Sequence, residues 1–279
     1  FDTCNKKLRL YTGLTVSLRH FFFLSKYFKL KKDLALLESQ RKDTDEYFKV
    51  TKLFPCYEDI SAKAGGGKGI YFFQDLYVAQ RIFKNNPVRH IDIGSRIDGF
   101  VAHVAAYRNI DVADIRPLED IIPNVHFIQA DLMKRDGLEK ECTDSISSLH
   151  ALEHFGLGRY GDTINYNGYL LGFKNITYML KPGGKFYFSV PLGEQRIEFH
   201  AHRVFSLSYL LKLVSEDYEV DRFSFIDDKG YLHADVKIDD EMIKTNCDCH
   251  YGCAVFELTK RSSQSPLVQL YVSAWQVSP

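Results

Sequence analysis

Residues 90–100 read HIDIGSRIDGF, and this stretch decides the fold. A short, mostly apolar strand at residues 91–93 runs into Gly94 and then into a segment with the pattern of a helix. Many nucleotide-binding α/β proteins begin with a strand, a glycine turn and a helix. The loop departs from a Gly-x-Gly-x-Gly pattern because Arg96 and Asp98 stand where its second and third glycines would be. The stretch therefore predicts a ligand-binding turn and leaves its ligand open.

The bulk composition is that of a globular protein with one large core. The chain has 279 residues, of which 45% are apolar, and its 36 basic residues balance its 36 acidic ones. This balance gives no support to a nucleic-acid partner. No run of eighteen apolar residues predicts a membrane span, and six cysteines in a chain of this length do not form a disulfide framework. The start, FDTCNKKLRLYTG, has no clear signal-peptide pattern. The cysteine usage indicates a reduced protein, and we expect it to be cytoplasmic.

The first 32 residues are unusually basic and also carry aromatic side chains at 21–23 and 27–28. One interpretation is a basic amphipathic segment in weak peripheral contact with an anionic membrane. The other is a helix that packs its aromatics on the main domain. We favour the second because the apolar residues are not confined to one stripe. With the glycine-rich 65–69 as a boundary, the sequence predicts a helical extension and linker over 1–70, a main domain over 71–262 and a tail over 263–279.

Strands and helices alternate through the main domain. The helices are expected at 72–84, 98–107, 167–180 and 207–215, and the strands at 89–93, 109–114, 124–130, 145–149, 185–190, 219–226 and 251–258. In the first helix, Phe72, Leu76, Ala79 and Phe83 define the expected buried face, and Ser206 is the expected N-cap of the last. This order predicts an α/β, Rossmann-like fold: a seven-stranded, mostly parallel sheet with helices on both faces.

Carboxylates follow two of the predicted strands, at the edge of the sheet where such folds bind ligands. Asp114 ends the second strand, twenty residues after Gly94, where a carboxylate can accept both hydroxyls of an adenosine ribose. That geometry serves NAD and S-adenosylmethionine alike. Arg96 disfavours the close backbone approach that a pyrophosphate needs, which argues against NAD. Asp131 follows the third strand, where it can accept from an adenine amino group.

With these residues placed, the chain resembles class I S-adenosylmethionine-dependent methyltransferases over residues 88–260. The resemblance rests on five segments: HIDIGSRIDG, DVADIRP, NVHFIQADL, DSISSLHALEHFG and LKPGGKFYFSVP. More narrowly, DIGSRIDGF, EHFGLGRYGD and AHRVF are similar to a little-characterised methyltransferase-like family of unknown function that is associated with bacterial polysaccharide gene clusters. The resemblance implies the fold, S-adenosylmethionine as cofactor and a sugar-related acceptor.

The resemblance also implies roles for single residues. Asp92 would orient the loop or, through water, the methionine amino group, and Gly94 would allow the turn. Asp114 would hold the ribose, Asp131 the adenine amino group, and Leu132 would place its amide near the ring. The full set of expected cofactor contacts is Asp92, Gly94, Ser95, Arg96, Asp114, Ile115, Asp131, Leu132 and His150.

A sugar hydroxyl loses its proton during methyl transfer, so the sequence must also offer a general base. The candidates are His150, His154, Asp162 and His202. His154, within Leu-Glu-His, has a structural alternative in bonding the neighbouring backbone. For the acceptor, Arg159 and Arg203 could bind an anionic group and Tyr160 could stack on a sugar; the alternatives are an Arg159–Asp162 pair in a surface loop and a salt bridge from Arg203 to a helix.

The cysteine-rich CDCHYGC at 247–253 does not match the spacing of a common zinc site, so we predict no metal. The sequence thus favours a methyltransferase that O-methylates a sugar or glycan intermediate. Two alternatives stay open: N- or C-methylation of another small molecule, and an inactive methyltransferase-like scaffold or glycan-binding module. The oligomeric state is not predicted.

Overall fold

The structure is a computed structural model that describes residues 24–40, 50–56, 62–63 and 66–262. The chain divides into two units, residues 1–66 and 67–279, and within the first unit residues 24–40 form a helix. Most of the basic segment, residues 1–23, and the predicted tail at 263–279 lie outside the described residues. Among the residues that are described, no helix is long and apolar enough to cross a bilayer.

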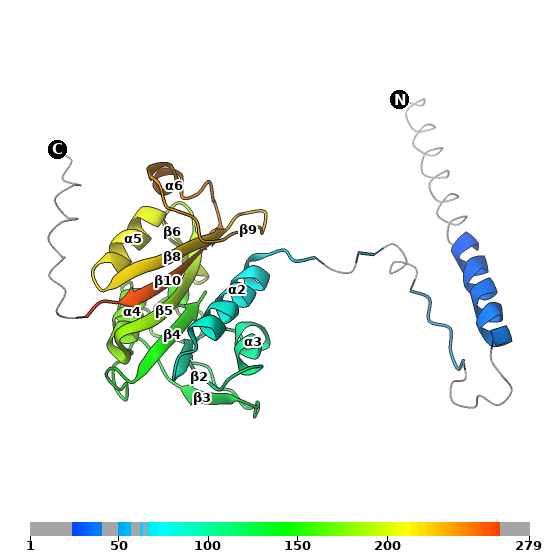
Figure 1. The fold of residues 1–279 in the computed structure, drawn as a ribbon, viewed down its shortest axis with the longest axis horizontal. Coiled ribbons are helices and arrows are strands. Elements are labelled where there is room, and N and C mark those ends of the chain that lie inside the picture. The colour runs from blue at the N-terminus through cyan, green and yellow to red at the C-terminus, as the bar shows by residue number, and fades with distance from the viewer. Residues whose placement is uncertain (1–23, 41–49, 57–61, 64–65, 263–279) are drawn as a thin grey trace, which may run out of the picture. The chain divides into compact units, whose positions relative to one another are not determined.

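The second unit is built on one eight-stranded sheet with the order β3-β2-β1-β4-β5-β10-β8-β9 (Figure 1). The five strands from β3 to β5 pair in parallel, whereas β10 runs antiparallel to both β5 and β8. The Rossmann-like fold is thereby confirmed. The predicted count of seven strands was wrong by one, because the two-residue β9 adds a strand at the edge of the sheet. A segment of two residues is too short to show the alternation of apolar and polar residues that identifies a strand.

Most elements lie where the sequence places them. The strands are β1 His90–Ile93, β2 Ile110–Asp114, β3 Val125–Gln129, β4 Thr143–Leu149, β5 Leu180–Leu192, β8 Tyr218–Ile226, β9 Leu232–His233 and β10 Gly252–Lys260. The helices are α2 Ile70–Asn85, η2 Ile97–Val101, α3 Ala102–Ala105, η3 Leu152–His154, α4 Gly168–Met179, α5 Leu207–Ser215 and α6 Asp240–Thr245. A separate hairpin, not predicted, pairs β6 Arg196–Glu198 with β7 His202–Val204.

Helices cover both faces of the sheet and create two apolar cores. Helices α2 and α3 pack on one face, and α4 and α5 pack on the other (Figure 1). Because both faces are covered, all four residues of β1 are buried. The predicted cap of α5 is confirmed, since Oγ of Ser206 accepts a hydrogen bond from the amide of Tyr209 at 3.3 Å.

The buried face of α2 matches the prediction only in part, since Ala79 is buried as expected. Phe72 and Phe83 are about half or more exposed, whereas Gln74 and Asp75 are buried, together with apolar neighbours. Apolar periodicity could not reveal this face, because part of what the helix buries is polar. The consequence is functional, since Gln74 and Asp75 line a cleft at the edge of the sheet.

Candidate functional site

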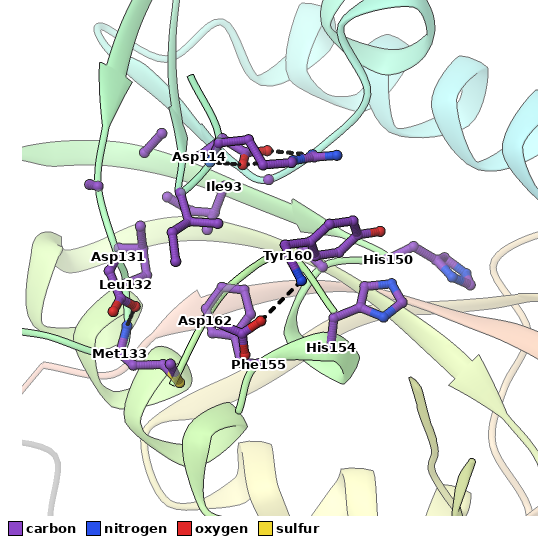
Figure 2. Close-up of a pocket in the computed structure, with 16 residues that line it drawn as sticks. Ile93, Asp114, Asp131, Leu132, Met133, His150, His154, Phe155, Tyr160 and Asp162 are labelled. Carbon is purple, nitrogen blue, oxygen red and sulfur yellow. Dashed lines mark hydrogen bonds and ion pairs between the residues drawn. The ribbon is translucent and has the colours of Figure 1, made fainter. Parts of the chain in front are cut away.

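A narrow pocket opens where four parallel strands end (Figure 2). Its walls contain six of the residues that the sequence singles out for a cofactor: Gly94, Asp114, Ile115, Asp131, Leu132 and His150. These residues lie at or just after the ends of β1, β2, β3 and β4, so the carboxyl ends of the strands bring them together. The other three expected contacts, Asp92, Ser95 and Arg96, do not line this pocket.

Asp92 fixes the loop after β1 from the protein interior. Its carboxylate is fully buried and accepts hydrogen bonds from the amide of Ser95 (3.0 Å), from Oγ of Ser95 (2.8 Å) and from Oγ of Ser147 (2.5 Å). Burial raises the pKa of Asp92 to about 6. Gly94 turns with φ +72°, and a Cβ there would lie 3.0 Å from Cβ of Ala151. The geometry places Asp92 beneath the loop, where it orients the turn.

Asp114 is engaged by a residue that the sequence analysis did not single out. Arg116 donates its backbone amide (2.8 Å) and Nε (3.0 Å) to Oδ1 of Asp114, and Nη2 (2.6 Å) to Oδ2. A carboxylate oxygen accepts about two hydrogen bonds, so only Oδ2 retains capacity in this arrangement. The Arg116 guanidinium also stacks 4.5 Å from the ring centre of Tyr160. The segment Asp-Ile-Arg could have signalled this pair.

The carboxylate of Asp131 has fewer hydrogen-bond partners than that of Asp114. Its Oδ1 accepts the amide of Met133 at 3.0 Å, and Nζ of the exposed Lys134 lies 3.5 Å from Oδ2. Leu132 is buried, and its carbonyl accepts a hydrogen bond from Nδ2 of Asn175, which ties this turn to α4. The turn after β3 is thus held in place while one carboxylate oxygen can still accept from a ligand.

A wider cleft of about 870 Å³ adjoins the narrow pocket. Four histidines line it: His150, His154, His200 and His202. Aromatic side chains, Tyr71, Tyr160, Phe199 and Tyr251, also line it. His150, His154 and Tyr160 belong to both cavities, so these side chains lie where pocket and cleft meet (Figure 2).

The histidines differ in how their ring nitrogens are used. Nδ1 of His154 donates to the carbonyl of Ala201 at 2.6 Å, and burial lowers the pKa of this imidazole. Nε2 of His202 lies 3.2 Å from Oε2 of Glu198 on the hairpin, but it has no partner in hydrogen-bond geometry among the described residues. Nδ1 of His150 lies 3.1 Å from Oε1 of the fully buried Glu153, while its Nε2 has no hydrogen-bond partner among the described residues.

Asp162 and Arg159 lie in the loop after η3, where Asp162 lines the narrow pocket and Arg159 lines the wide cleft. Oδ2 of Asp162 accepts the amides of Gly156 (2.7 Å) and Gly158 (3.2 Å), and Oδ1 accepts that of Tyr160 (3.2 Å). This carboxylate organises the loop and does not pair with Arg159. Arg159 donates to the carbonyl of Ala201 at 3.1 Å and lies in the cleft wall.

Arg203 lies away from both cavities. It is 4% exposed, and its guanidinium donates to the carbonyls of Glu153, Phe155 and Tyr166. The structure gives Arg203 neither the place in the cleft that was expected nor the salt bridge that was the alternative. It joins β7 to η3 and the following loop instead. Sequence reasoning could not find these partners, because backbone carbonyls carry no residue-specific signal.

Comparisons with known proteins agree on the fold and leave the activity open. Residues 112–244 match the model of a family described as Caenorhabditis protein of unknown function, DUF268, and no curated protein matches the chain. Among solved structures, the [4+2]-cyclase SpnF is 15% identical with a TM-score of 0.50, over 71% of this chain and 86% of that one.

Two further structures are of methyltransferases. The 1,6-didemethyltoxoflavin-N1-methyltransferase of Burkholderia thailandensis is 13% identical with a TM-score of 0.48, over 68% of this chain and 79% of that one. The N-methyltransferase NodS of Bradyrhizobium japonicum is 13% identical with a TM-score of 0.46, over 69% and 88%. At 15% identity, the likeness to SpnF shows a Rossmann-like fold and no more. Because a cyclase shares it, function has to be argued from the site.

Proposed function

We propose that the protein is an S-adenosylmethionine-dependent methyltransferase. The observation that carries the proposal is the meeting of Gly94, Asp114 and Asp131 in one narrow pocket at the ends of β1, β2 and β3. Two carboxylates suit the hydroxyl and amino donors of an adenosine group. Bound S-adenosylmethionine would supply a methyl group on a positively charged sulfur.

The loop after β1 argues against a dinucleotide. A pyrophosphate needs free backbone amides at a helix N-terminus, but Asp92 occupies the amide of Ser95. Asp98 adds a negative charge in the first turn of η2, with its side chain 72% exposed. Both features disfavour a phosphate at this position, and neither disfavours an adenosine without a pyrophosphate.

The finer part of the proposal is O-methylation of a sugar or glycan hydroxyl. The wide cleft supports it, because exposed aromatic rings such as Tyr71 and Tyr160 can pack against sugar faces while imidazoles contact hydroxyls. N- or C-methylation of another small molecule would use the same pocket. One observation favours the inactive scaffold instead, namely that Arg116 occupies most of the Asp114 carboxylate.

Calorimetric titration of the full chain with S-adenosylhomocysteine, with NAD as the control ligand, tests the proposal. We expect micromolar binding of the first alone. Asp114→Ala should weaken it roughly tenfold or more, because a charge-assisted hydrogen bond contributes about 1.5–3 kcal/mol. Asp111→Ala is the matched control, since Asp111 lies on the same strand and pairs with Arg89 outside the pocket. Binding of neither ligand would favour the scaffold, and unchanged affinity in Asp114→Ala would remove Asp114 from the site.

A further inference from the structure

Glu153 is a buried carboxylate whose contacts are unusual. It lies on η3 with no exposed surface, and its Oε1 lies 3.1 Å from Nδ1 of His150 and 3.5 Å from Nε2 of His154. Neither oxygen has a donor in hydrogen-bond geometry among the described residues, and the two imidazoles are its ion-pair contacts. A buried charge with so few partners is costly to the fold. Burial raises the pKa of Glu153, but the neighbouring His150 outweighs this effect and lowers the pKa overall.

Only one of the two imidazoles keeps a nitrogen for a ligand. His154 uses Nδ1 on the carbonyl of Ala201 and turns its other nitrogen toward Glu153. Nδ1 of His150 lies 3.1 Å from Oε1 of Glu153 as an ion-pair contact, and its Nε2 is buried without a partner in hydrogen-bond geometry in the described part of the chain. The thiol of Cys253 is a further neighbour that raises the pKa of this ring. The backbone of His150 has φ +52°, in the left-handed region that few non-glycine residues adopt, and such conformations cluster at functional sites. His150 also lines both cavities.

We propose that Glu153 and His150 form the proton-accepting pair of this site, and that the acceptor is a hydroxyl compound bound in the wide cleft against Nε2 of His150. The proposal rests on the methyltransferase function proposed above. His150 is the catalytic residue, because it touches the acceptor. Glu153 is a positioning residue, because it acts through the imidazole by holding Nδ1–H and leaving Nε2 with its lone pair.

The proposed step balances in atoms and charge. The acceptor oxygen bonds to the methyl carbon while the bond from that carbon to the sulfonium sulfur breaks, and the electron pair stays on sulfur. The hydroxyl proton passes to Nε2 of His150. The positive charge therefore moves from sulfur to an imidazolium that already faces the Glu153 carboxylate. A hydroxyl is a weak nucleophile that gains from such a base, roughly 10²–10⁴-fold in rate.

The surroundings of His150 determine when it can act as a base. Charged and titratable groups near it come from η3, from α2 and from the start of β10: Glu153, His154, Tyr71, Asp75, Tyr251 and Cys253. Burial disfavours the charged imidazole, but Cys253 and Glu153 outweigh burial and raise the pKa of His150 well above its ordinary value. The base form therefore accumulates only as the pH rises above that raised pKa, so transfer should increase with pH through neutrality.

Nitrogen-15 resonances of the histidine rings test the pair in the full chain without any acceptor. His150→Gln assigns the His150 signals. We expect neutral His150 to carry its proton on Nδ1, and Glu153→Gln to lower the His150 pKa by roughly one unit or more, since an opposite charge at this distance is lost. Glu257→Gln is the matched control: Glu257 is 4% exposed and pairs with Arg81 at 2.7 Å, so it also removes a buried charge. An unchanged His150 pKa in Glu153→Gln, or a neutral ring protonated on Nε2, overturns the pair.

Transfer from tritiated S-adenosylmethionine tests the acceptor. The hydroxyl probes are methyl glycosides and nucleotide sugars, and the amine probes are glycine and spermidine. We expect transfer to a hydroxyl probe, lowered roughly 10²-fold in Glu153→Gln and less in Glu153→Asp, with affinity for S-adenosylhomocysteine unchanged. Any one of three results overturns the proposal: transfer to amines alone, no transfer to any hydroxyl probe, or full transfer in Glu153→Gln. If S-adenosylhomocysteine does not bind at all, the methyltransferase proposal fails, and the ring resonances still decide whether the pair exists.

Discussion

Two histidines of one sheet, His90 and His150, are both buried but are used in opposite ways. At the start of β1, both ring nitrogens of His90 have partners, Oγ of Ser145 at 2.7 Å and Oγ of Ser147 at 3.1 Å. At the end of β4, His150 has one nitrogen near Glu153 and one without a partner among the described residues. Burial lowers the pKa of His90 to about 3, whereas the neighbours of His150 raise its pKa.

The partners of His90 also fix its protons. Ser147 gives its only hydroxyl proton to Asp92, so its oxygen accepts from Nε2–H of His90. Nδ1 then accepts from Ser145. The chain of donors runs from Ser145 through His90 and Ser147 to Asp92 and closes within the protein. A closed network stabilises a structure, whereas a buried imidazole nitrogen without a partner beside a cavity calls for a functional explanation, such as a ligand.

Breaking the closed hydrogen-bond network around Asp92 should have the largest effect on the stability of the fold. Asp92→Ala removes the acceptor of three hydrogen bonds and leaves the hydroxyls of Ser95 and Ser147 buried without it. We expect the free energy of unfolding to fall by about 3 kcal/mol, measured in urea. Asp98→Ala is the control, because Asp98 pairs with Arg96 on the surface, and it should change stability by less than about 0.5 kcal/mol. A loss below about 1 kcal/mol in Asp92→Ala would contradict the closed network.

A fall in pH should have the second-largest effect on stability, and it should act through His90. His90 has a folded pKa of about 3, below its unfolded value of about 6.5, so the unfolded chain binds the extra proton and the stability that His90 contributes is lost as pH falls below about 6.5. Between pH 7 and pH 5 this loss is about 2 kcal/mol. Asp92 acts in the other direction, because its folded pKa of about 6 is raised, and protonation favours the folded state.

The comparison with His90→Gln isolates the histidine from Asp92. The difference in unfolding free energy between the native chain and His90→Gln should shrink by about 2 kcal/mol from pH 7 to pH 5. A difference that stays constant over this range would mean that His90 is not held neutral in the fold.

The sequence predicts the sheet far better than it predicts these networks. Apolar runs and glycine turns located the central strands, and strand ends located Asp114 and Asp131 because parallel strands share one edge. No feature of the neighbouring sequence distinguishes the role of His90 from that of His150, because the hydrogen-bond partners of His90 lie 55 and 57 residues further along the chain. The buried polar face of α2 was missed for the same reason: only the folded neighbours show that Gln74 has a partner in Ser189.

The carboxylate of Asp114 is intermediate between the fully paired ring of His90 and Nε2 of His150, which has no partner within the described residues. Its partner Arg116 is half-exposed, so this guanidinium can move away. If an adenosine ribose binds Asp114, its hydroxyls must compete with this guanidinium for the carboxylate. Arg116→Gln should therefore tighten binding of S-adenosylhomocysteine by about two- to fivefold, because a partly exposed ion pair is worth less than about 1 kcal/mol. Arg261→Gln, which removes a remote pair with Glu219, should leave the affinity unchanged. Weaker binding in Arg116→Gln would instead mean that the guanidinium contacts the ligand and that the pair with Asp114 is part of the bound state.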